Sequence, residues 1–243
     1  MDPSHQGGRR VAFFGGSFDP PHLGHLAVAR AARMALRLDA VLFAPVGAQP
    51  LKPGGSGASF ADRLEMTRLA IAGEPGFSIS LADAPKPAGV PNYTLETLLN
   101  LRAGLPLDGA LFCLMGADSY FSLRSWHRAA EIPFAAPLIV ASRPGQRPDQ
   151  WIARLQAALP AGLTIESAPI EDETVGDVEV RSFILLNHEG SRAPFYLLPG
   201  LNVEISASEI REQIHAAQGS RTAGHKLIPD AVSAYIRSHG LYC

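Results

Sequence analysis

A glycine-rich string with two histidines, Gly15-Gly16-Ser17-Phe18-Asp19-Pro20-Pro21-His22-Leu23-Gly24-His25, is the feature that most constrains the fold. It follows the short apolar run Val11 to Phe14 and opens the segment Leu23 to Leu36, whose alanines, leucines and arginines have helical spacing. Glycines at a strand-to-helix junction let the backbone turn tightly and approach a ligand closely. The N-terminus of the following helix favours anions such as phosphate. The string therefore predicts an α/β protein with an anion site at this junction.

The rest of the chain continues the same alternation of strands and helices. Further strand-like runs lie at 40–44, 77–81, 110–115 and 138–141, and helical segments lie at 60–72, 95–101 and 151–159. This rhythm predicts a Rossmann-like, doubly wound, mostly parallel sheet with helices on both faces. Such sheets bind ligands at the carboxyl ends of their strands. Function is therefore expected in the loops Gly15 to His25, Pro45 to Pro53 and Gly116 to Trp126.

The composition of the 243 residues excludes several classes of protein. Hydrophobic residues make up 47% and charged residues 18%, which is typical of a globular chain. A net charge of -2 gives no indication of a nucleic-acid surface, and no apolar run is long enough to span a membrane. Cys113 lies in an apolar run and Cys243 is terminal, so a disulfide is not expected and a reducing, cytoplasmic location is favoured.

The expected domain organisation is simple. Residues 1–10 are polar and form a flexible extension, and residues 11–243 form a single domain with an insertion around 166–201. Within that insertion, the stretch Glu166 to Val180 carries six acidic residues and no Lys or Arg, which favours a solvated surface excursion. The apolar runs Phe183 to Leu186 and Phe195 to Leu198 are expected to form an extra hairpin or edge strand.

The two histidines of the string carry the expected chemistry. His22 and His25 are three residues apart in the first helical turn and so share a face, and Gly24 leaves room between them. Two imidazoles directed at a phosphate would stabilise the charge that develops during phosphoryl transfer. One alternative is a buried turn whose histidines only satisfy core hydrogen bonds. A zinc site is another, but there is no Cys nearby and a glycine-rich loop is an unusual metal scaffold.

The string resembles the GG(T/S)FDPxHxGH signature of the HxGH nucleotidyltransferase superfamily. The superfamily's second signature, ISSTxIR, has a counterpart near the C-terminus in Ile205-Ser206-Ala207-Ser208-Glu209-Ile210-Arg211. Within the superfamily the chain most resembles the bacterial nicotinate-mononucleotide adenylyltransferases.

Shorter matches favour that branch. They are Arg63 with Met66, the segment Tyr93 to Leu98, the block Gly116-Ala117-Asp118 with Trp126, and the tail Ile228 to Tyr242. The loop Pro45 to Lys52 is also similar, but Leu51 stands where the family usually has His.

The resemblance implies an adenylyltransferase that transfers AMP from ATP to nicotinate mononucleotide, giving deamido-NAD and pyrophosphate. It implies that His22, His25 and Arg211 are catalytic. The implied ATP-binding residues are Gly15, Gly16, Ser17, Phe18, His22, Gly24, His25, Ile205, Ser206, Ser208 and Arg211. The implied mononucleotide-binding residues are Lys52, Tyr93, Thr94, Asp118 and Trp126. Mg²⁺ is expected to enter with the ATP phosphates and to have no protein ligands.

Three of the acceptor-side residues also have a plainer interpretation. Trp126 would stack on a pyridine ring, but it would also suit a core position. Asp118 would bind a ribose hydroxyl or cap a helix, and Lys52 would meet a phosphate or lie on the surface.

Rival functions differ in chemistry. Nicotinamide mononucleotide or phosphopantetheine would be the acceptor in related enzymes, and a catalytically silent nucleotide-binding module is a third alternative. A dinucleotide-binding oxidoreductase would need a G-x-G-x-x-G pattern, which Gly15 to Phe18 does not supply. The sequence leaves open the choice between nicotinate and nicotinamide, a homo-oligomer, the role of residues 166–201 and the effect of Leu51.

Overall fold

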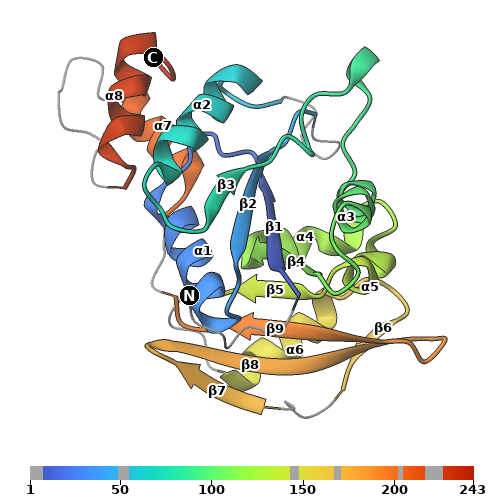
Figure 1. The fold of residues 1–243 in the computed structure, drawn as a ribbon. Helices are drawn as coiled ribbons and strands as arrows, with labels where there is room; N and C mark the ends of the chain where they lie inside the picture. Colours follow the sequence, from blue (N-terminus) through green and yellow to red (C-terminus); the bar gives the residue numbers. More distant parts are fainter. Residues whose placement is uncertain (1–7, 49–54, 143–147, 167–170, 202–204, 217–226) are drawn as a thin grey trace. The chain divides into compact units, whose positions relative to one another are not determined.

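A computed structural model describes residues 8–48, 55–142, 148–166, 171–201, 205–216 and 227–243 (Figure 1). The chain divides into two compact units, neither of which is one continuous stretch of sequence. The first comprises Met1–Phe14, Val28–Val41 and Tyr93–Asn202, and the second comprises Gly15–Ala27, Leu42–Asn92 and Val203–Cys243. Strand β1 (Arg10–Gly16), helix α1 (Leu23–Ala35) and strand β2 (Ala40–Pro45) contribute residues to both units.

Four parallel strands form the centre of the first unit. Strand β1 pairs with β4 (Ala110–Gly116), β4 pairs with β5 (Leu138–Ala141), and β5 pairs with β9 (Arg192–Leu198). Almost every residue of β4 and β5 is buried, which explains why these strands are continuous apolar runs in the sequence. Strand β9 was expected to be a peripheral addition, but its pairing places it beside β5 in the parallel sheet.

An antiparallel extension follows from β9. Strand β8 (Val178–Asn187) forms a long hairpin with β9, as expected, and also pairs with β6 (Leu163–Ile165) and β7 (Glu171–Val175), as Figure 1 shows. The acidic stretch expected to be a solvated excursion therefore belongs partly to the β7–β8 hairpin. Its apolar positions Val178 and Val180 are buried, because alternate residues of a strand face the core.

The helices of the first unit cover its sheet. They are α3 (Thr94–Ala103), α4 (Ala117–Ser122), α5 (Ile132–Ala135) and α6 (Pro148–Ala158), with 3₁₀ turns at Leu123–Ser125 and Ala129–Glu131. Tyr120 of α4 is fully buried, and its hydroxyl donates to the carbonyl of Leu155 in α6. Thr94 is the first residue of α3, and Tyr93 occupies the N-cap without a side-chain hydrogen bond.

The second unit combines strand ends with a helical cluster. The last residues of β2 lie next to β3 (Phe77–Ile79), with the Ser80 N–H donating to the Phe43 carbonyl at 2.8 Å. Helices α2 (Phe60–Ile71), α7 (Ala207–Ala216) and α8 (Asp230–His239) share one apolar core. A 3₁₀ turn, Pro87–Gly89, lies in the loop after β3.

The predicted α/β class with a mostly parallel central sheet is confirmed. The strand order follows β1-β4-β5-β9-β8-β6 in the first unit, and the C-terminal ends of β1 and β2 are joined in the second by a bond from the Val46 N–H to the Gly16 carbonyl. The glycine-rich string leaves β1 at this strand end, where parallel sheets bind their ligands. The expectation of a single domain over residues 11–243 stays a prediction.

Candidate functional site

The two histidines of the glycine-rich string lie against each other. His22 immediately precedes α1 and is 7% exposed, whereas His25 lies in the first turn and is half-buried. Their rings stack with centroids 3.7 Å apart and an interplanar angle of 26°. The shared face predicted from their spacing is therefore present. The interpretation as ordinary core histidines does not account for Nδ1 of His22, which is buried without a hydrogen-bond partner in the described part of the chain.

Burial keeps both imidazoles neutral. It lowers the pKa of His22 from 6.5 to about 4. The pKa of His25 also lies well below 6.5, first because of burial and second because of the neighbouring His22. The backbone N–H of His22 donates to Nδ1 of His25 at 3.2 Å. Since Nδ1 accepts this bond, the neutral His25 ring carries its proton on Nε2, which makes Nε2 a donor.

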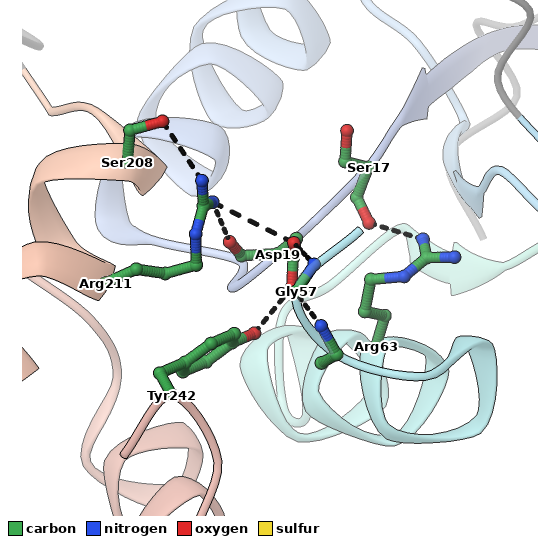
Figure 2. A network of polar contacts seen from close by, with 8 residues as sticks. Ser17, Asp19, Gly57, Arg63, Ser208, Arg211 and Tyr242 are labelled. Carbon is green, nitrogen blue, oxygen red and sulfur yellow. Dashed lines mark hydrogen bonds and ion pairs between the residues drawn. The ribbon is translucent and has the colours of Figure 1, made fainter. Parts of the chain in front are cut away.

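Asp19, which belongs to the same loop, is the centre of a polar network (Figure 2). Its side chain is 5% exposed, and its carboxylate accepts hydrogen bonds from the backbone N–H groups of Gly57 and Ala58 at 2.6 and 3.1 Å. The hydroxyl of Tyr242 donates to it at 2.7 Å. A guanidinium nitrogen of Arg211 lies 3.8 Å from the carboxylate and donates to the Asp19 carbonyl at 2.7 Å. This buried charge is therefore held by donors from three separate segments.

Arg63 binds the backbone at the start of the glycine-rich loop. It lies in α2, is 2% exposed, and donates to the carbonyls of Ser17 and Val46 at 2.6 and 2.8 Å. Burial lowers its pKa, an effect partly opposed by Asp19 and Tyr242. One guanidinium thus ties the loop after β1 to the residue that follows β2.

The second signature lies at the start of α7. Ser206 precedes the helix, and its carbonyl accepts from the Ile210 N–H, while Ile205 packs on the α2–α7–α8 core. Ser208 is exposed, and its hydroxyl accepts a hydrogen bond from Arg211 at 3.1 Å. Because Arg211 also donates to Asp19, the structure brings the two signatures together, as Figure 2 shows.

The side chain of Phe18 packs closely against other residues of the glycine-rich loop. Its backbone is left-handed, with φ of 47°, and its buried ring contacts His25 at a centroid distance of 4.9 Å. A Cβ on Gly16 would lie 3.3 Å from this ring, so a side chain there would press on it. Gly15 and Gly16 end β1, and Gly24 is buried in the first turn of α1.

The described acceptor-side candidates lie in the first unit. Tyr93 packs on His127 with ring centroids 4.3 Å apart, which brings the start of α3 to the residue after Trp126. Trp126 is half-buried, and its indole N–H donates to Ser122 at 3.2 Å, so the interpretation as a core tryptophan is wrong. Asp118 is exposed in α4, whose N-cap is Gly116, so Asp118 is not the cap.

Two predicted positions complete the acceptor side. Thr94 is half-buried at the first position of α3. Lys52, with Leu51, lies outside the described residues.

Four residues of these surroundings were not predicted as site residues: Asp19, Arg63, His127 and Tyr242. Asp19 lies inside the glycine-rich string, but an Asp before a proline is common in turns, so its buried network left no separate signal in the sequence. Arg63 and Tyr242 appeared only as parts of the family pattern. Their contacts to the loop come from segments far away in the sequence, which periodicity cannot connect.

Two further properties of the described residues bear on other classes of protein. No group of three or more His, Cys, Asp and Glu side chains there could hold a metal ion. No helix in the described ranges is long and apolar enough to cross a membrane.

The chain belongs to the cytidylyltransferase-like family, whose model matches residues 13–213. This match covers both signatures and the three strand-end loops in which function was expected.

Relatives place the chain more narrowly. A probable nicotinate-nucleotide adenylyltransferase of Gloeobacter violaceus is 37% identical over 235 residues, covering 97% of each chain. A protein of the same name from Citrifermentans bemidjiense is 37% identical over 233 residues, covering 96% of this chain and 98% of the relative. The predicted resemblance to the nicotinate-nucleotide adenylyltransferase branch is therefore confirmed.

Solved structures agree on the fold. The Plasmodium falciparum nicotinic acid mononucleotide adenylyltransferase complexed with APC matches with a TM-score of 0.63 at 15% identity, covering 96% of this chain and 97% of that one. The same protein complexed with NaAD matches with a TM-score of 0.63 at 16% identity and the same coverage.

Proposed function

We propose that this chain transfers AMP from ATP to nicotinate mononucleotide. A phosphate oxygen of the mononucleotide attacks the α-phosphorus of ATP and forms the new P–O bond. The bond from the α-phosphorus to the bridging oxygen breaks, and pyrophosphate leaves with the electron pair. Deamido-NAD is the second product. No covalent intermediate with the protein is required, so the chain's contribution is to position the reactants and to offset charge on the transferring group.

The observation that carries the proposal is the neutral histidine pair at the start of α1. Two neutral imidazoles can lie 3.7 Å apart, whereas two imidazolium ions at this distance would repel each other. The Nε2–H of His25 is fixed as a donor by the bond that its Nδ1 accepts. Helix α1 has no acidic residue in its first turn to offset the positive end of its dipole. Both features suit a phosphoryl group with growing negative charge.

The second signature supplies the fixed positive charge. Arg211 is tied to Ser208 and to the loop that carries the histidines, and we assign it to the ATP triphosphate. The ATP-binding residues proposed beside it are Gly15, Gly16, Ser17, Phe18, Gly24, Ile205 and Ser206. Mg²⁺ enters as part of the substrate MgATP. The carboxylate of Asp19 already accepts three hydrogen bonds, so its donor set does not suit a metal ligand.

The acceptor side is assigned to the first unit. Trp126, half-buried beside the Tyr93–His127 contact, offers a flat face for the pyridine ring. Thr94 and Asp118 are assigned to the same substrate. Lys52 is proposed for its phosphate from the family pattern alone. A cytoplasmic location agrees with the free cysteines Cys113 and Cys243.

The first experiment measures pyrophosphate release with ATP and Mg²⁺. Nicotinate mononucleotide, nicotinamide mononucleotide and phosphopantetheine are tested in parallel, and each product is identified by mass. Preference for the nicotinate acceptor is expected. Preference for phosphopantetheine would support the assignment to the nucleotidyltransferase superfamily but contradict nicotinate mononucleotide as the acceptor. No turnover with any of the three would favour a catalytically silent nucleotide-binding module.

His25→Ala tests the role of the histidine pair. Loss of a donor that acts mainly in the transition state is expected to lower kcat by about 10²–10³. His188→Ala removes a histidine that is 79% exposed in the first unit and serves as the matched control. Near-normal kcat in folded His25→Ala would contradict the assignment.

A further inference from the structure

The Asp19 carboxylate presents an electrostatic problem for an ATP site. It is a buried negative charge within the loop on which we place the triphosphate. It also lies 3.8 Å from Arg211, the cation assigned to the same phosphates. A carboxylate with too few donors would draw the guanidinium into a direct ion pair. Arg211 would then be shared between Asp19 and the nucleotide.

The donors around Asp19 remove much of this competition. Two are backbone N–H groups, from Gly57 and Ala58, and the third is the hydroxyl of Tyr242 at 2.7 Å. Arg211 donates its hydrogen bonds to the Asp19 carbonyl and to Ser208, and it keeps only a longer contact of 3.8 Å with the carboxylate. The guanidinium is thereby oriented, while one third of the Arg211 side chain stays exposed.

Tyr242, the next-to-last residue, is built into this position. Its backbone is left-handed, with φ of 65°, a conformation that costs free energy for a residue other than glycine and persists only when its surroundings impose it. Its ring packs on the α2–α7–α8 core. Burial is the main cause, and the bond to Asp19 the second, of a raised pKa of its hydroxyl, so the group stays protonated and remains a donor.

Gly57 shows how little room the network leaves. A Cβ there would lie 3.3 Å from the Tyr242 ring, 3.4 Å from Cδ of Arg211 and 3.4 Å from the Asp19 carboxylate. Asp19 and its partners Tyr242 and Arg211 therefore all lie against Gly57 in the second unit, which Figure 2 shows from close by.

We infer that Tyr242 is a positioning residue for ATP: its hydroxyl satisfies the carboxylate of Asp19 and so leaves Arg211 available to the triphosphate. This inference rests on the proposed ATP site. It assigns to the C-terminal residues a part in nucleotide affinity, beyond their packing in the helical cluster.

The test is the affinity for MgATP, measured by titration calorimetry without any acceptor. Tyr242→Phe removes one oxygen and keeps the ring. Its dissociation constant is expected to rise about tenfold, the size expected for the loss of one hydrogen bond to a charged group. Tyr235→Phe is the matched control, because its hydroxyl donates to Asp62 at 3.0 Å, also within the second unit. The control is expected to change ATP affinity less than about twofold, and melting curves verify that both variants fold.

A double-mutant cycle separates positioning from packing. In an Arg211→Gln background, Tyr242→Phe is expected to have little further effect on ATP affinity, because the competition for the guanidinium no longer exists. Equal effects of Tyr242→Phe in both backgrounds would overturn the inference, as would wild-type affinity in the folded single variant. Because the assay omits the acceptor, a wrong acceptor assignment would appear only in the turnover experiment.

Discussion

The buried histidine pair predicts a specific dependence of stability on pH. His22→Gln is the informative change, because the pKa of His22 is about 4 in the folded protein and 6.5 is its ordinary value. The unfolded chain therefore binds a proton more tightly than the folded chain between these values. The stabilisation contributed by neutral His22 is fully present above pH 6.5 and is lost as the pH falls toward 4.

The magnitude follows from linkage. Each tenfold difference in proton affinity is worth about 1.4 kcal/mol, so the wild type is expected to lose about 2 kcal/mol of unfolding free energy through His22 between pH 8 and pH 5. For a chain of 243 residues this corresponds to a fall of roughly 5 °C in Tm. His22→Gln cannot show this loss, and the burial that chiefly lowers the pKa of His25 remains in both proteins.

Urea unfolding at pH 8 and pH 5 measures the effect. The difference between wild type and His22→Gln is compared with the difference between wild type and His188→Gln, which replaces an exposed imidazole. The first difference is expected to shrink by about 2 kcal/mol at pH 5, whereas the second is expected to stay constant. Parallel pH dependence in all three proteins would refute the reasoning from burial.

Three further changes test other parts of the structure. Trp126→Ala is expected to raise KM for the pyridine mononucleotide about tenfold with little change in KM for ATP. Steady-state kinetics with each substrate varied in turn measure both values. An unchanged KM for the mononucleotide would show that Trp126 does not contact the pyridine ring. Arg63→Met leaves one buried and one partly buried carbonyl without their donor and is expected to cost about 2–4 kcal/mol in urea unfolding. A loss below about 0.5 kcal/mol would contradict the proposed link between the two loops. Gly47→Ala places a Cβ 2.5 Å from the backbone of Pro85 and is expected to cost about 1–3 kcal/mol by the same assay. Gly104→Ala, which meets only ordinary contact at 3.6 Å, is its control, and equal losses would contradict the steric argument.

The parallel strands were predictable because burial on both faces leaves a direct record in the sequence. Strands β4 and β5 are nearly all apolar, and glycines or polar residues follow them. The acidic stretch was harder to interpret, since charge alone does not distinguish a loop from a strand with one solvated face. The pairing of β9 with β5 could not be read at all, because a parallel partner is chosen by the packing of the whole sheet.

The functional site likewise has residues that the sequence predicts and properties that only the structure shows. Residues close together in sequence, such as His22 and His25, were found from their helical spacing. The second signature, Ile205 to Arg211, was found from its resemblance to a family motif. Trp126 was recognised as a candidate, but only its half-buried position and its bond to Ser122 decide against a core role.

By itself the sequence determined the strand–turn–helix that carries two adjacent imidazoles, because helical spacing and glycine's backbone freedom act over a few residues. Only the tertiary structure decided their neutral state, since the pKa of a histidine depends on how much solvent the rest of the fold removes from it. The same holds for Asp19. Its partners Gly57, Arg211 and Tyr242 are distant in sequence, and only folding brings their donors to one carboxylate.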